Sequence, residues 1–323
     1  MDDISGARVL VTGGAGFVGS NLAEQFAEMG AHVRVLDNLS TGNLRNIDGL
    51  DVEFVEGDIR DLDAVLKAAD GIDYVLHHAA VASVPESTRD PLGSSDVNIS
   101  GTLNVLEASA RQDVKRMVFA SSASVYGQGD NAPITETLPI KPCSPYAASK
   151  AAGEAMCHAY ASSMGVETVS LRYFNIFGKR QDPRSHYAGV IPVFIDSLRK
   201  GEPAVIFGDG LQTRDFVFVD DVVQANLLAC LQPDISMAAF NIGHGRSVSI
   251  MELAEGIATA MNLSLVMKHL PIRVGDVRHS LADITLARTA LGYSPKTTFA
   301  QGLSQTIDWF EATRGGYRGE RAG

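Results

Sequence analysis

The amino-terminal part of the chain combines a short apolar run with a glycine-rich turn and a helical stretch. The run from Ala7 to Val11 is rich in β-branched residues, and the segment from Ser20 to Met29 has a helical pattern. Four glycines lie between them: Gly13, Gly14, Gly16 and Gly19. The last three fit the spacing G-x-G-x-x-G, while the first, third and fourth equally fit G-x-x-G-x-x-G. Both spacings place backbone N–H groups and a helix N-terminus against a pyrophosphate, where missing Cβ atoms allow close approach. The chain is therefore expected to begin with a dinucleotide-binding strand, turn and helix.

A second apolar run, from His32 to Leu36, ends in an acid, Asp37. An acid at this place, about twenty residues after the glycines, accepts hydrogen bonds from the ribose hydroxyls of a dinucleotide. Its charge would also repel a 2′-phosphate, so the position predicts NAD rather than NADP. The alternative interpretation is a surface acid that merely ends a strand.

Strand-like and helix-like segments alternate as far as about Gly178. The strand-like runs are Ala7 to Val11, His32 to Leu36, Val52 to Val55, Tyr74 to His78, Arg116 to Ala120 and Thr168 to Tyr173. This alternation predicts an α/β fold with a doubly wound parallel sheet. After Gly178 a polar, turn-like segment from Lys179 to Tyr187 leads into shorter elements.

Tyr146 and Lys150 are four residues apart, which places a phenol and an ammonium on one face of a helix. A phenol titrates near pH 10 in water, but a lysine cation beside it favours the phenolate and lowers its pKa. The tyrosine could then take a proton from an alcohol. Taken alone, the same spacing also describes a half-buried aromatic residue next to a solvated charge.

A run of hydroxyl side chains follows the strand-like segment from Arg116 to Ala120. It includes Ser121, Ser122 and Ser124. Such a run either caps a turn or presents hydrogen-bond donors to a ligand at the carboxyl edge of a parallel sheet.

With the glycine turn before these serines and Tyr-x-x-x-Lys after them, the chain resembles the extended short-chain dehydrogenase/reductase family. In particular it resembles nucleotide-sugar 4-epimerases of the UDP-galactose or UDP-N-acetylglucosamine type. The resemblance covers nearly the whole chain. Further family-like stretches are Asp37 to Gly42, Glu56 to Asp61, His77 to Ala80, Leu171 to Gly178 and Gly208 to Phe216.

The resemblance implies a Rossmann-like NAD-binding domain over residues 1–178, with segments near 217–245 returning to it. Residues 179–323 would mainly form a smaller, discontinuous substrate domain. The residues implied for NAD binding are Gly13, Gly16, Phe17, Val18, Asp37, Asn38, Ser40, Gly42, Asp58, Ile59, His77, Ala79, Ala80, Tyr146, Lys150 and Tyr173.

The resemblance also implies the chemistry. Tyr146, as phenolate, would remove the proton of the sugar 4-hydroxyl while hydride passes from C4 to the nicotinamide, and Ser122 would share that proton's hydrogen bonds. Lys150 would hold the nicotinamide ribose. Related dehydratases and decarboxylases carry acids after this serine, whereas the present chain has Ala123 and Ser124. Epimerisation through a 4-keto sugar is therefore expected.

A UDP-sugar is the implied substrate. The residues implied to bind it are Ser122, Ser124, Tyr146, Asn175, Val190, Arg214, Arg273, Asp276 and Ser280. In this pattern Arg214 and Arg273 hold the diphosphate and Asp276 holds the uridine ribose. Ser280, four residues after that acid, is the position beside the sugar C2 substituent. A small residue there leaves room for an N-acetyl group, so interconversion of UDP-N-acetylglucosamine and UDP-N-acetylgalactosamine is expected, with UDP-glucose and UDP-galactose as weaker or comparable substrates.

Composition restricts the partners and the location. A net charge of -11 disfavours nucleic acid and anionic membranes as partners. The absence of a signal-like start and of an apolar stretch of about eighteen residues predicts a cytoplasmic protein. Three cysteines without a C-x-x-C pair disfavour disulfides and a cysteine zinc site. His77 and His78 are adjacent and would point to opposite faces of a strand, so no metal is expected.

The family resemblance further implies a homodimer, formed by two helices per subunit that match Asp96 to Arg111 and Ala147 to Met164. Two alternatives to the main functional prediction remain open. One is another reaction of the same family, UDP-glucuronate 4-epimerisation or sugar-nucleotide dehydration. The other is a non-catalytic dinucleotide-binding protein of the same fold.

Overall fold

A computed structural model describes residues 3–128, 133–182, 189–272 and 277–313 of the chain. Its large sheet has seven parallel strands in the order β10-β6-β5-β4-β1-β2-β3. These strands are β1 (Arg8–Thr12), β2 (His32–Asp37), β3 (Val52–Glu56), β4 (Tyr74–His77), β5 (Arg116–Ser122), β6 (Glu167–Tyr173) and β10 (Ala239–Ile242). Each of the six predicted strand-like runs coincides with one of them.

The strand order reverses between β1 and β4, which lie side by side at the centre of the sheet. Thr12 and His77, the last residues of the two strands, are partners across this pair. In open α/β sheets the crevice outside the carboxyl ends of two such strands is the usual place for a ligand. The topology thus locates a binding site at the edge where β1, β4 and β5 end.

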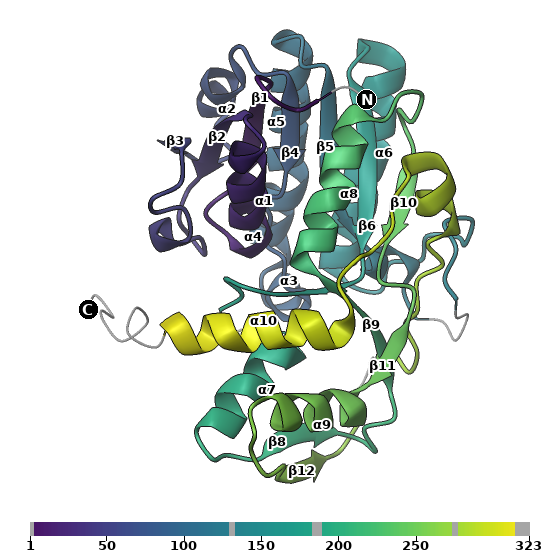
Figure 1. Cartoon of the computed structure of the whole chain (residues 1–323). Helices are drawn as coiled ribbons and strands as arrows, with labels where there is room; N and C mark the ends of the chain where they lie inside the picture. The colour runs from purple at the N-terminus through teal and green to yellow at the C-terminus, as the bar shows by residue number, and fades with distance from the viewer. Residues whose placement is uncertain (1–2, 129–132, 183–188, 273–276, 314–323) are drawn as a thin grey trace.

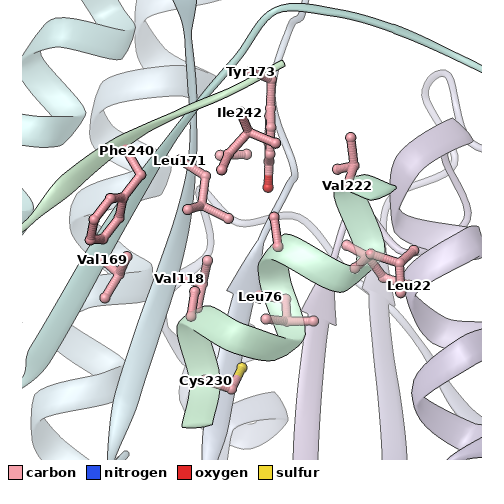
Figure 2. Packing of buried hydrophobic residues seen from close by; sticks show 14 of the residues in the cluster. Leu22, Leu76, Val118, Val169, Leu171, Tyr173, Val222, Cys230, Phe240 and Ile242 are labelled. Atoms are coloured by element: carbon pink, nitrogen blue, oxygen red, sulfur yellow. The ribbon is translucent and has the colours of Figure 1, made fainter. Parts of the chain in front are cut away.

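Helices cover both faces of the large sheet (Figure 1). On one face α1 (Phe17–Glu28) and α8 (Val219–Leu231) pack against the strands. Figure 2 shows this core, where Val222 and Cys230 of α8 face Leu76, Val118 and Leu171 of the strands. The opposite face is covered by α2 (Leu62–Ala69), α5 (Gly101–Arg111) and α6 (Pro145–Met164).

A second, smaller group of elements has its own apolar core. Its sheets are the three-stranded β11-β9-β7 and the parallel pair β12-β8. The elements are β7 (Asn175–Phe177), α7 (Val190–Arg199), β8 (Ala204–Phe207), β9 (Thr213–Phe218), β11 (Ser247–Ser249), α9 (Ile250–Ala260), β12 (Met267–Leu270) and α10 (Phe299–Ala312). Phe177 is the centre of an aromatic cluster, with its ring centroid 5.5 Å from Phe218 and 5.6 Å from Phe299. In Figure 1, α10 runs between this lobe and the large sheet.

Short helical turns complete the described part of the chain. They are the 3₁₀ turns Leu44–Asn46 and Ala123–Tyr126, the helices α3 (Val84–Arg89) and α4 (Pro91–Ser95), and the π turns Asp96–Ser100 and Ala287–Leu291. Among the described residues no helix is long and apolar enough to span a bilayer. Nor does any group of three or more His, Cys, Asp or Glu side chains in that part of the chain form a metal site.

Candidate active site

The glycine turn between β1 and α1 leaves no room for side chains. Gly13 has φ +68°, and a Cβ there would lie 2.7 Å from the backbone nitrogen of Ala79. A Cβ at Gly19 would lie 2.2 Å from the Gly13 carbonyl oxygen. At the start of α1 the N-cap residue, Gly16, has no side chain to bind the free N–H groups. The turn therefore fits a dinucleotide pyrophosphate, which would take those amides at the helix N-terminus.

The acid that ends β2 lies beside this turn. Asp37 is buried, and its carboxylate accepts hydrogen bonds from the backbone N–H groups of Ala15 at 3.0 Å and Leu39 at 2.8 Å. A Cβ at Gly42 would lie 2.7 Å from Asp37 Oδ1, so the loop after β2 closes tightly over the acid. Asp37 and the glycine turn thus form one structural unit.

A second group of predicted cofactor residues lies at the neighbouring strand ends. Asn38 Nδ2 donates to Asp58 Oδ2 at 2.9 Å, and the Ser40 N–H donates to Asn38 Oδ1 at 3.0 Å. A hydrogen bond from Arg60 holds the pKa of Asp58 well below its usual value. Ile59 is buried beneath Gly101 of α5, so its side chain belongs to the core.

His77 is fully engaged inside the protein. Its Nδ1 lies 2.7 Å from Thr12 Oγ1 and its Nε2 lies 3.0 Å from Thr102 Oγ1. Because the Thr102 hydroxyl donates to the Asn98 carbonyl at 2.7 Å, the imidazole donates from Nε2 and accepts at Nδ1. Burial lowers the pKa of His77 far below its usual value. Its imidazole therefore links the ends of β1 and β4. Ala79 and Ala80 follow in the loop after β4, where the Ala79 nitrogen approaches Gly13.

Tyr173 and His78 form a buried polar pair near the end of β6. His78 Nε2 lies 3.1 Å from the Tyr173 hydroxyl, which also lies 2.9 Å from Asn226 Nδ2 of α8. Burial lowers the pKa of His78 to about 3 and raises that of Tyr173. Both side chains are therefore neutral at physiological pH. In the described part of the chain, the Tyr173 hydroxyl thus bonds to His78 and Asn226.

The Tyr146 helix starts at a well-defined cap. The Ser144 hydroxyl accepts the Ala147 N–H at 3.1 Å, Pro145 occupies the first turn, and the Tyr146 N–H donates to Ser87 Oγ at 3.0 Å. Lys150, one turn further, is buried and donates from Nζ to the Ala120 carbonyl at 2.7 Å. Burial lowers the pKa of Lys150 to about 8.

Ser122 ends β5 directly beside this helix. Its hydroxyl accepts the Ser124 N–H at 3.2 Å, and its proximity to Tyr146 favours the phenolate of that residue by lowering its pKa. The net effect on Tyr146 differs from the sequence-based expectation. Burial raises the pKa of the phenol, and the Ser122 hydroxyl only partly opposes this effect. The Lys150 ammonium lies 5.9 Å from the centre of the Tyr146 ring and binds a carbonyl instead, so in the protein alone it does not make Tyr146 acidic.

Asn98 is a site residue that the sequence did not indicate. It lies in the π turn Asp96–Ser100, where its amide pairs with both backbone groups of Val81. Its Nδ2 also donates to Ser149 Oγ at 3.0 Å, and that hydroxyl donates to the Tyr146 carbonyl at 2.8 Å. Asn98 thus links the loop after β4 to the start of α6. A π turn, which commonly marks a functional site, has no side-chain periodicity that would reveal it in advance.

The predicted substrate residues of the smaller lobe gather along β9. Asn175 Nδ2 donates to the Asp215 carbonyl at 3.1 Å, and the Ser280 N–H donates to the Thr213 carbonyl at 3.1 Å. Arg214 lies between Thr213 and Asp215 on the same strand. Val190 is the first residue of α7. Arg273 and Asp276 lie outside the described residues.

Asp215 organises this region. Its buried carboxylate accepts the N–H groups of His244 at 2.7 Å, Gly245 at 3.0 Å and Ala282 at 3.1 Å. A single side chain therefore joins β9 to the loop after β10 and to the segment that follows Ser280. Sequence reasoning did not single out Asp215, because a buried acid next to a candidate arginine is indistinguishable in sequence from a surface ion pair.

Known proteins match the chain over almost its whole length. The model of the NAD dependent epimerase/dehydratase family matches residues 9–243. The UDP-glucose 4-epimerase of Mycolicibacterium smegmatis is 39% identical over an alignment of 309 residues that covers 94% of this chain and 98% of that protein. A UDP-N-acetylglucosamine 4-epimerase from Methanobrevibacter ruminantium, solved with UDP-N-acetylmuramic acid, has a TM-score of 0.92 and 38% identity, covering 96% of this chain and 99% of that one.

A further solved structure is the Thermus thermophilus UDP-glucose 4-epimerase in complex with NAD. It has a TM-score of 0.87 and 39% identity, covering 94% of this chain and 99% of that one. These similarities confirm the predicted α/β fold class and the family resemblance, and with it NAD as the cofactor and an enzyme as the kind of protein. The chain belongs to the NAD dependent epimerase/dehydratase family.

Proposed function

We propose that this protein inverts C4 of a UDP-hexose through a 4-keto intermediate, with NAD as a bound prosthetic group. The observation that carries the proposal is the meeting of Ser122, Tyr146 and Lys150 at the carboxyl edge of the sheet, beside the glycine turn. The similarity to enzymes described as UDP-sugar 4-epimerases supports the same conclusion.

Each of the three side chains has a separate task. Tyr146 takes the proton of the sugar 4-hydroxyl at its phenolic oxygen and later returns it, while Ser122 hydrogen-bonds the same oxygen. Lys150 holds the nicotinamide ribose and brings a positive charge to the site. NAD held there would supply the acceptor for the C4 hydride and the donor for its return to the other face of the sugar. Because the Tyr146 pKa is raised in the protein alone, its ionisation requires a stabilising positive charge that the protein alone does not place beside the phenol.

The cofactor would lie across the turn and the strand ends already described. The amides from Gly13 to Val18 would hold the pyrophosphate, and Asp37 would accept the adenosine ribose hydroxyls. Asn38, Ser40, Gly42 and Asp58, which contact one another or Asp37 at the neighbouring strand ends, would surround the adenosine end.

The substrate would extend from Tyr146 to β9 of the smaller lobe. Arg214 would pair with the diphosphate, together with Arg273, while Asp276 would hold the uridine ribose. Ser124 supports a sugar contact, because its Oγ is buried and makes no hydrogen bond within the described residues. Ser280, half-buried beside Thr213, is small enough that it would leave space for an N-acetyl group at C2. We therefore infer a preference for UDP-N-acetylglucosamine and UDP-N-acetylgalactosamine.

The open alternatives are less well supported. A dehydratase needs an acid next to the serine, but Ala123 and Ser124 occupy the 3₁₀ turn that follows Ser122. A non-catalytic sensor would have no need of Tyr146, Lys150 and Ser122 in contact. UDP-glucuronate 4-epimerisation would use the same three side chains. An assay with that substrate is therefore needed to distinguish it.

A homodimer is also proposed, formed by the outer faces of α5 and α6. Leu103 of α5 and Ala148 and Ala155 of α6 are exposed. Ala108 and Gly153, by contrast, are buried against the protein's own core, and Gly153 packs on Phe119. Some small residues of the two helices therefore pack inside the subunit, while others are exposed on the face proposed for the dimer interface. Sedimentation velocity would give the mass of the particle directly.

One experiment tests the reaction. The purified protein is incubated separately with UDP-N-acetylglucosamine, UDP-glucose and UDP-glucuronate, and NMR distinguishes the axial from the equatorial C4 product. Formation of the C4 epimer from the first two substrates is the expected result. A 4-keto-6-deoxy product, or no conversion of any UDP-sugar, would overturn the proposal.

A further inference from the structure

A buried ion pair lies directly behind the proposed catalytic side chains. Glu154 is the third member of a row at four-residue spacing on α6, after Tyr146 and Lys150. Its carboxylate receives two hydrogen bonds from Arg172 of β6, from Nε at 2.9 Å and from Nη2 at 2.7 Å. The side chains of Glu154 and Arg172 are only 9% and 7% exposed. Two ions this deep require several well-placed partners, because desolvation is costly.

The partners come from both sides of Ser122. Ser121, the residue before it, donates its hydroxyl to Glu154. Tyr126, at the end of the turn that Ser122 caps, accepts a hydrogen bond from Arg172 Nη1 at 2.8 Å. Its ring lies 5.0 Å below the guanidinium carbon. The ion pair therefore joins the helix that carries the base to both ends of the serine turn.

We propose that Glu154 and Arg172 are positioning residues of the reaction, which hold the Ser122 turn in place against the helix that carries Tyr146. This inference rests on the proposed function. The planar guanidinium is essential to it, because one rigid fork binds a carboxylate on α6 and a phenol on the turn at once, and lysine has a single point charge. Glu154 accepts hydrogen bonds from both Ser121 and Arg172. Glu154 thus connects α6 to the residue before Ser122, and Arg172 connects α6 to the end of the serine turn.

The same pair of strands contains a matched control at its other end. Arg116 and Glu167 are partners in the register of β5 and β6, just as Ser121 and Arg172 are. Arg116 is also buried, pairs with Glu167, and donates to the carbonyls of Ala229, Cys230 and Gln232. Arg116 is six residues from Ser122, or about 20 Å along an extended strand. It shares the chemistry of Arg172 without its contact to the serine turn.

The test compares Arg172→Lys with Arg116→Lys. Both variants keep the positive charge and lose the planar guanidinium group with its several N–H donors, so both should lower the melting temperature. Only Arg172→Lys is expected to lower kcat, by about tenfold to a hundredfold, while KM changes by less than about threefold. It should also move the acid limb of the kcat profile to higher pH, because Tyr146 loses the nearby Ser122 hydroxyl that favours the phenolate. A Glu154→Leu, Arg172→Met double variant avoids an unpaired buried charge and should show the same changes in kcat and pH profile as Arg172→Lys.

A spectroscopic titration keeps this inference separate from the proposed reaction. The tyrosinate absorbance of Tyr146 is obtained by subtracting the titration of a Tyr146→Phe variant in the same background. A shift to higher pH in Arg172→Lys, and none in Arg116→Lys, supports the positioning role whether or not the substrate has been identified. An unshifted titration in both the Arg172→Lys and the double variant would overturn it, as would equal losses of kcat in Arg172→Lys and Arg116→Lys. Absence of epimerisation by the unmodified protein would instead count against the proposed function.

Discussion

At the scale of single residues, the site depends on two ionisable groups that burial pushes in opposite directions. The pKa of Tyr146 is raised and that of Lys150 falls to about 8. Burial disfavours the charged form of each, which means an anion for the phenol and a cation for the amine. The catalytic forms, phenolate and ammonium, are therefore the ones that the protein alone disfavours. Cofactor and substrate must supply the interactions that stabilise them.

The first prediction concerns Tyr146→Phe. The change removes only the phenolic oxygen, so folding and NAD binding should be retained while turnover falls by about a hundredfold to ten-thousandfold. Coupled assay of the C4 epimer gives kcat, and thermal melting with and without NAD serves as the control. Activity within about tenfold of the unmodified enzyme would exclude Tyr146 as the base.

The second prediction uses the pKa of Lys150 in cofactor-free protein. Between about pH 8 and pH 10.5 the folded chain has released a proton that the unfolded chain still holds. Unfolding then takes up a proton, so this residue makes the free energy of unfolding rise with pH across that window. Urea denaturation at pH 7.5 and at pH 10 should show a larger rise in the free energy of unfolding, by about 2 kcal/mol, in the unmodified protein than in Lys150→Met. Parallel pH dependence in the two proteins would contradict the lowered pKa.

At the scale of elements, the third prediction concerns the close packing of the glycine turn between β1 and α1. Gly19 and Gly256 are both glycines inside helices. A Cβ at Gly19 would overlap the Gly13 carbonyl oxygen, whereas one at Gly256 would have its nearest neighbour 3.5 Å away, at Leu303. Gly256→Ala should raise stability by about 0.5 to 1 kcal/mol through helix propensity. Gly19→Ala should lower stability and abolish NAD binding, as measured by chemical denaturation and calorimetric titration. Equal effects at both sites would refute the close-packed turn.

The fourth prediction concerns the end of β2. Excess NAD should raise the melting temperature, with a stabilisation of about 2.7 kcal/mol at a concentration of one hundred times Kd. NADP should stabilise much less, because its 2′-phosphate would meet the buried carboxylate of Asp37. Asp37→Ser is the matched variant and should narrow the difference between the two cofactors. Equal stabilisation of the unmodified protein by both would remove the basis for the NAD preference.

The elements also show why some of the fold could be predicted and some could not. The six predicted parallel strands are rich in apolar residues and alternate with helix-length segments, so this pattern located them closely. Strand β10, of only four residues, joins the same sheet beside β6, and its sequence alone does not indicate that partner. The Arg172–Glu154 pair was equally invisible, because the two residues are eighteen positions apart and meet only when β6 packs on α6. Local patterns predict elements, while partners depend on tertiary packing.

At the scale of the whole molecule, the proposed substrate would contact both groups of elements. Tyr146 and Ser122 are at the edge of the large sheet, whereas Arg214 and Ser280 lie along β9 in the smaller lobe. The junction is built around Asp215, whose carboxylate fixes three segments at once. In the proposed reaction the chemistry would depend on one lobe and the choice of sugar on the other, so changes in specificity should leave the proton-transfer groups untouched.

The last prediction tests that separation at Ser280. The segment around Ser280 is held to β9 by two backbone hydrogen bonds with Thr213, from the Thr213 N–H to Arg278 and from the Ser280 N–H to Thr213. A substitution of the side chain should therefore leave the backbone in place. Ser280→Tyr would fill the space proposed for the N-acetyl group and should lower kcat/KM for UDP-N-acetylglucosamine by more than about tenfold, while UDP-glucose is largely spared. Steric exclusion acts on the larger substrate alone, which is how a specificity gate differs from a general defect.

Ser280→Ala provides the control, since it removes the hydroxyl but keeps the gate small. It should retain the wild-type ratio of the two activities, measured by NMR of the C4 products with each substrate in turn. A wild-type ratio in Ser280→Tyr as well would mean that this side chain does not face the C2 substituent. In that case the preference for N-acetylated sugars would lose its structural basis, while the roles of Tyr146, Lys150 and Ser122 would stand, because they depend on contacts in the other lobe.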